Sequence, residues 1–306
     1  MKKNAPIFLV IGLVLVISAV WGILFDIQVR PGGGLKKLVA IFKPTPTPLP
    51  EPSIENLEAM VIPQEGYEVK LNWGETGKKL VDVGGIDMNK YIENYSGVEN
   101  EELLSYLKGS KDGGITINKS NAYFWVNTLW ALGLTQNSKV LSEGIMGTEY
   151  KDRLGNFAST GGWTLGAKDA VSLYSSSMII DLDEDEQEMV RAISANIYRP
   201  CCGNPTSFPD CNHGMAILGL VELMVDQGFS EEEIYKASLA FNSYWFPQTY
   251  IDLAYYFQTK NNVLWKDIDA KELLSAQYSS APGYQAIKEE IGDVPGTKSK
   301  GGSCGA

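Results

Sequence analysis

The sequence is short of the side chains on which much catalytic chemistry depends. It holds one histidine and four cysteines among 306 residues. With a single histidine and no G-x-S-x-G segment, no Ser-His-Asp hydrolase constellation can be assembled. A glycine-rich phosphate loop and a repeat of 20–50 residues are also absent from the sequence. The numerous acidic residues do not exclude a glycoside hydrolase that works with two carboxylates, but nothing in the sequence selects a pair.

Positive charge is scarce as well. The chain has 26 lysines and arginines against 37 acidic residues, a formal net charge of −11. Before Pro44 basic residues outnumber the single acid, Asp26, so the remainder is more acidic than the whole. Such a body repels nucleic acid and anionic lipid headgroups, and we expect no nucleic-acid partner. The apolar content of 44% is that of a folded protein.

An uncharged run from Ala5 to Phe25 predicts an N-terminal transmembrane helix. At 1.5 Å per residue this run spans about 31 Å, the thickness of the bilayer hydrocarbon. The alternative is a cleaved signal peptide, whose apolar part is usually shorter and ends at a small-x-small site. Ser18-Ala19-Val20 matches such a site poorly. Residues 1–27 are therefore interpreted as an uncleaved membrane anchor.

Residues 28–53 are interpreted as a basic juxtamembrane stalk and a Pro-rich linker. The segment Lys43–Pro52 carries five prolines, which predicts an extended, semi-rigid spacer. Leu35–Phe42 is either an amphipathic segment on the membrane surface or ordinary stalk. Lysines flank the apolar run on both sides and leave its orientation open. The spacer and the acidic body favour a single-pass cell-membrane protein with its body on the extracytoplasmic side.

The rest of the chain predicts a mainly α fold. A compact multi-helix domain is expected at 118–290, after a mixed lead-in at 54–117 that is irregular or contains short β-strands, one of them at Ile115–Ile117. A flexible Gly/Cys tail is expected at 291–306. The hydrophobic periodicity and the flanking breakers predict helices at 121–132, 166–180, 186–198, 215–227, 229–244, 248–258 and 269–277. The helices at 121–132 and 215–227 are apolar enough to be buried.

Acidic residues mark two of these helix starts. Asp181–Glu186 imitates the beginning of a calcium loop, but its sixth position is not glycine and Ala192 stands where the last glutamate belongs. These acids are therefore expected to cap a helix. Ser230 and Glu233 form a capping-box pattern at the start of another. In the apolar helix at 121–132, Trp125 and Trp130 are expected to be core residues rather than a ligand-stacking face.

The stretch R-P-C-C-G-N-P-T-S-F-P-D-C-N-H holds three of the four cysteines, Cys201, Cys202 and Cys211, and the only histidine, His213. Thiolates and imidazole ligate zinc, copper and iron. The segment predicts a helix start with Asp210 as N-cap, Cys211 first and His213 third in the helix. A helix N-terminus lowers the pKa of a cysteine, so Cys211 is expected to have thiolate character.

Three interpretations of this stretch stay open. The first is a site for zinc, copper or haem iron, with Cys202, Cys211 and His213 as the preferred ligands and Cys201 as the fourth. The second is a redox pair of Cys211 with Cys201 or Cys202, and the third is a structural disulfide between the same residues. A metal or redox role implies a transfer partner protein. Cys304 in the tail is either a mobile thiol that serves this site or a loose surface cysteine.

The same stretch resembles, in outline, the thiol subunits of cytochrome c maturation. R-P-C-C-G-N-P-T, a helix, and then G-F-S-E-E-E-I carry this resemblance. Those subunits are membrane-anchored three-helix domains with an R-C-x-x-C-x-N motif. The resemblance implies thiol–disulfide exchange, although adjacent Cys201 and Cys202 replace the Cys-x-x-Cys pair.

Overall fold

The structure is a computed structural model that describes residues 49–95 and 101–295. The predicted anchor at 1–27, nearly all of the linker at 28–53 and Cys304 in the tail lie outside these residues. The described part is mainly helical, which confirms the predicted class. Over residues 49–95 and 101–295, no helix has both the length and the apolarity needed to cross a bilayer.

The lead-in region combines short helices with one small sheet. In chain order it contains α2 (Ile54–Val61), β1 (Tyr67–Val69), α3 (Thr76–Asp82), α4 (Met88–Asn94), α5 (Glu101–Ser105) and β2 (Ile115–Ile117). The two strands pair antiparallel, with Tyr67 opposite Ile117, so the predicted β contribution is confirmed. Helices α4 and α5 match the helix-like run that the sequence predicts from Asp87 and again over Glu101–Lys108, whereas α2 and α3 add to what was predicted. Ser53 and Asp87 supply the N-caps of α2 and α4.

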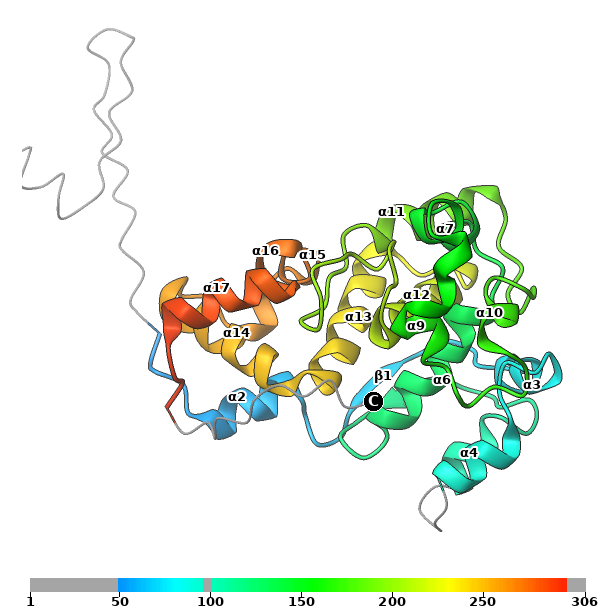
Figure 1. Ribbon diagram of the computed structural model, residues 1–306. Coiled ribbons are helices and arrows are strands. Elements are labelled where there is room, and N and C mark those ends of the chain that lie inside the picture. The colour runs from blue at the N-terminus through cyan, green and yellow to red at the C-terminus, as the bar shows by residue number, and fades with distance from the viewer. Residues whose placement is uncertain (1–48, 96–100, 296–306) are drawn as a thin grey trace, which may run out of the picture. The chain divides into compact units, whose positions relative to one another are not determined.

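The helical region follows. It contains α6 (Ala122–Thr135), α7 (Lys139–Ser142), α8 (Ile145–Thr148), the 3₁₀ turn η2 (Lys151–Asn156), α9 (Ala158–Gly161), α10 (Ala170–Leu173), α11 (Glu184–Ser194), α12 (Asn212–Asp226), α13 (Glu231–Trp245), α14 (Pro247–Lys260), η3 (Trp265–Asp267), α15 (Ala270–Leu273), α16 (Ala276–Ser279) and α17 (Ala281–Ile291). In Figure 1, α12 lies among α6, α9, α11 and α13, and α14 lies with α2 and α17.

Helices α6 and α12 form the centre of the core, as their apolar sequences predicted. Both are buried along almost their whole length. They approach closely because a glycine of each faces the other: a Cβ on Gly133 would lie 2.1 Å from the Met215 carbonyl oxygen, and one on Gly219 would lie 2.6 Å from that of Leu129. The contact fixes α12, and therefore the loop that enters it, against the rigid core.

Two helix starts are capped as predicted. Asp183 caps α11 and Ser230 caps α13, each in a capping box completed by the glutamate three residues later. In each box, the side chain of the N-cap accepts one backbone N–H that the helix leaves unbonded. The acids at the start of α11 therefore stabilise a helix end.

Two predicted helices are wrong in extent. The helix expected at 166–180 is only α10, because Ser175 takes a positive φ of 51° and the chain then bonds to the end of α6 through the carbonyls of Leu134 and Thr135. The helix expected at 269–277 divides into α15 and α16. There the Leu274 carbonyl accepts the N–H of Tyr198, a tertiary contact that periodicity does not reveal.

Candidate metal centre

The cysteine-containing loop ends at Cys211, which is itself the N-cap of α12. Its Sγ accepts the N–H of Gly214 at 3.4 Å, so a sulfur replaces the usual oxygen cap. The prediction that Asp210 caps this helix is wrong, and His213 is second rather than third in the helix. The Asp210 carboxylate instead accepts hydrogen bonds from Asn204 and Arg199.

A buried arginine holds the cysteine-containing loop through hydrogen bonds to three of its residues. Arg199 has no exposed surface, and its guanidinium donates to Cys211 Sγ at 3.1 Å and to Asp210 Oδ1 at 2.6 Å. It also donates to the Asn204 carbonyl at 2.9 Å. The guanidinium has room only because residue 214 is glycine, since a Cβ there would lie 2.4 Å from Arg199 Cζ. The sequence reasoning missed Arg199, although it opens the cysteine stretch.

The three thiols converge on Cys211. The Sγ atoms of Cys201 and Cys211 are 3.3 Å apart, a hydrogen-bond separation rather than the roughly 2.05 Å of a disulfide. Cys202 Sγ lies 3.5 Å from Asp210 Oδ1. Among the described residues the three cysteines are free thiols.

Two sets of potential ligands share Cys211. Cys201, Cys211 and His213 form one set and Cys202, Asp210 and Cys211 the other, and the ligand atoms within each set lie within 4.8 Å of one another. The structure therefore groups Cys201, rather than the expected Cys202, with the histidine. Cys202 instead belongs to the set with Asp210, a potential ligand that the sequence reasoning used only as a cap.

His213 is held in place by aromatic neighbours. Its imidazole is 5% exposed, and its ring centroid lies 4.5 Å from that of Phe246 and 5.5 Å from that of Trp245. No described residue forms a hydrogen bond with its Nδ1. A buried nitrogen without a partner costs about 1–3 kcal/mol, and coordination of Nδ1 to an ion would remove that cost. The imidazole also hydrogen-bonds to Cys211 and helps to lower the pKa of that thiol.

The electrostatics favour one thiolate at Cys211. Hydrogen bonds from the Cys201 and Cys202 thiols, and the charge of Arg199, lower the pKa of Cys211 well below its usual range. The pKa of Cys201 is raised, because it donates its proton to the neighbouring sulfurs. Burial acts to lower the pKa of Arg199, but the facing cysteines raise it above its ordinary value. The predicted thiolate character of Cys211 thus arises mainly from the thiols and the arginine.

A cavity of about 450 Å³ is lined in part by Cys201 and Cys211. The residues that line it are Asn94, Tyr123, Asn127, Trp130, Ala158, Gly162, Trp163, Thr164, Leu165, Cys201, Cys211 and Asn212. Apart from the Cys211 thiolate, none of them carries a charged side chain. Trp130 and Trp163 are both nearly buried, with ring centroids 4.9 Å apart. Trp125 and Trp130 are core residues as predicted, but Trp130 also borders this cavity.

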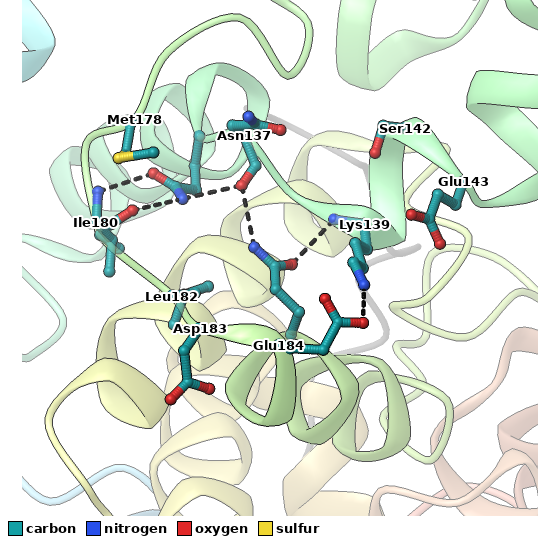
Figure 2. A pocket seen from close by; sticks show the side chains of 11 residues that line it. Asn137, Lys139, Ser142, Glu143, Met178, Ile180, Leu182, Asp183 and Glu184 are labelled. Atoms are coloured by element: carbon teal, nitrogen blue, oxygen red, sulfur yellow. Dashed lines mark hydrogen bonds and ion pairs between the residues drawn. The ribbon is translucent and has the colours of Figure 1, made fainter.

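A second cavity, of about 300 Å³, is less suited to a ligand (Figure 2). Its polar groups already bind one another: Gln187 Oε1 accepts the Lys139 N–H at 3.0 Å, and the Lys139 ammonium pairs with Glu184. Gln136 Oε1 accepts the N–H groups of Ile179 and Ile180, each at 2.9 Å. These contacts join α6, α7 and α11 and account for the polar lining.

A comparison of the chain with protein-family models, curated proteins and solved structures finds no match. The class of site therefore follows from its geometry: a cysteine–histidine cluster able to hold a metal ion.

Proposed function

We propose that this protein is a membrane-anchored, extracytoplasmic protein that binds a soft metal ion through Cys201, Cys211 and His213. The observation that carries the proposal is the convergence of two sulfurs on a buried imidazole whose Nδ1 has no partner among the described residues. The apolar N-terminal run and the Pro-rich linker support the location.

The spacing of the ligands suits one ion. Two sulfurs on a tetrahedral zinc, with bonds of about 2.3 Å, lie about 3.8 Å apart. Cys201 and Cys211 Sγ are 3.3 Å apart, so small side-chain rotations would admit the ion. Thiolate and imidazole are also preferred ligands of copper. Asp210 is engaged by Arg199 and Asn204, which makes the set containing His213 the stronger candidate.

Elemental analysis of the full-length protein, purified without a metal-chelating tag, tests this proposal. We expect about one equivalent of zinc, copper or iron per chain. Substitutions Cys211→Ser and His213→Gln would remove it, whereas Cys304→Ser, the matched thiol control, would leave it bound. A metal-free protein that lacks two free thiols until reductant is added would contradict the proposal.

A second candidate is a thiol–disulfide oxidoreductase, which the 3.3 Å approach of Cys201 and Cys211 Sγ favours. The Cys211 thiolate would attack a substrate disulfide, forming a mixed disulfide and releasing one substrate thiolate. Cys201, after losing its proton to solvent, would then attack Cys211 Sγ, close an intramolecular disulfide and release the second thiolate. The substrate disulfide accepts the two electrons. His213→Gln separates the candidates, because it would abolish metal binding but only alter the rate of exchange.

A further inference from the structure

The cavity of about 450 Å³ that Trp130 and Trp163 line, here called the aromatic cavity, shares Cys201 and Cys211 with the cysteine–histidine cluster. His213, the third ligand, does not line the cavity and packs against Phe246 and Trp245 instead. An ion held by these three residues would lie between the imidazole and the part of the cavity wall that Cys201 and Cys211 form. Its remaining coordination position would therefore face the cavity.

Cys202 is not grouped with His213 in the structure. Its sulfur belongs to the other ligand set, 3.5 Å from Asp210 Oδ1 and 3.8 Å from the Asn204 carbonyl oxygen. Structural zinc sites are closed by four protein ligands, whereas sites with three protein ligands keep a position for water or substrate.

The chemistry of the cavity defines what could occupy it. A volume of about 450 Å³ is within the range of small-molecule sites. Trp130 and Trp163 are fixed by hydrogen bonds from their indole N–H groups to the carbonyls of Ser159 and Gly85, at 2.6 and 3.0 Å. They offer aromatic surface for an apolar ring. Since no lysine, arginine or histidine lines the cavity, a carboxylate on the body of the ligand would enter it without a cationic side chain to pair with.

One polar group in the cavity is preorganised. Asn127 is 3% exposed, and its amide nitrogen donates to the Tyr95 hydroxyl at 2.7 Å. That bond fixes the amide plane and leaves its oxygen as an acceptor.

We propose that the cavity is a ligand-binding site for a small aromatic molecule with an uncharged body, which places a soft donor atom in the open coordination position of the metal. This inference rests on the proposed metal binding. Under this inference, the metal held by Cys201, Cys211 and His213 binds a substrate or ligand and is not a structural metal.

The test uses full-length protein loaded with Co²⁺, whose visible absorption bands report the ligands of the ion. Thiophenol is the probe, and 4-mercaptobenzoate, which adds a carboxylate, is the charged comparison. We expect thiophenol to shift the Co²⁺ bands and to change tryptophan fluorescence, with at least tenfold weaker binding of 4-mercaptobenzoate.

Two variants locate the binding. Ala158 is exposed and lines the cavity, so Ala158→Phe would fill it, leave the Co²⁺ bands unchanged and weaken thiophenol at least tenfold. Ala192→Phe, on the exposed face of α11, is the control with wild-type binding.

The outcomes separate the two proposals. If no Co²⁺ bands form, the metal proposal fails. If the bands form but thiophenol leaves them unchanged, removes the ion, or binds Ala158→Phe as tightly as wild type, the ligand site is overturned while the metal site stands.

Discussion

Replacing Arg199 by methionine should be among the most destabilising substitutions in the loop. The guanidinium is fully buried, and its loss would leave Asp210 and the Cys211 sulfur without their cationic partner. Removing one member of a buried ion pair costs about 3–5 kcal/mol. Asp210 keeps its bond from Asn204, and its side chain is 22% exposed. We therefore expect a loss near the lower limit, about 3 kcal/mol.

Urea denaturation of the full-length protein measures this loss, with Arg191→Met as the control. Arg191 is 41% exposed and pairs with Glu143 at 2.8 Å on the surface, so its replacement should cost less than about 1 kcal/mol. In the double variant Arg199→Met/Asp210→Asn, removal of the second charge should recover part of the stability. If Arg199→Met is no more destabilising than Arg191→Met, the argument from the buried ion pair is refuted.

Three further predictions concern helices α12 and α13. Burial raises the pKa of Glu222 well above its usual range. A carboxyl group whose pKa is raised by folding stabilises the protein fully below its unfolded pKa of about 4, and this contribution falls by up to about 1.4 kcal/mol per pH unit as the pH rises toward the folded pKa. Glu222→Gln should flatten the free energy of unfolding measured between pH 5 and 8, whereas the exposed control Glu149→Gln should not. Gly219→Ala, whose Cβ would meet the Leu129 carbonyl at 2.6 Å, should cost about 1–3 kcal/mol and lower the melting temperature; an unchanged value would refute the tight crossing. Ser230→Ala should cost about 1 kcal/mol in urea denaturation through loss of the α13 cap, and no loss would show that the capping box is dispensable.

Local chemistry explains which parts of the fold were predictable. Helices α6, α12, α13 and α14 are long, have apolar surface and begin or end at recognisable signals, so periodicity located them within a few residues. The prediction of a helix over 166–180 was wrong because tertiary hydrogen bonds replace local ones there. The backbone of this segment bonds to the end of α6. The prediction of one helix at 269–277 was wrong for a similar reason, because the Leu274 carbonyl between α15 and α16 accepts a tertiary hydrogen bond from Tyr198.

The sequence alone determined that the chemistry would gather in one loop. Three cysteines and the only histidine lie within a short stretch before an apolar helix, and chain connectivity keeps them close in any compact fold. It also determined that the body is acidic and mainly helical. Thiolate character at Cys211 was predicted from its place near a helix start, but its cause is the neighbouring thiols and Arg199.

Only the tertiary structure decided which of the cysteines shares a ligand set with His213. Both Cys201 and Cys202 contact Cys211, but Cys201 shares a ligand set with His213 and Cys202 shares one with Asp210. Arg199 reaches Cys211 because α12 carries glycine at position 214. The aromatic cavity forms from α4, α6, α9 and the cysteine loop, which lie far apart in the chain. Side-chain direction and long-range packing set these contacts, and neither is encoded in local spacing.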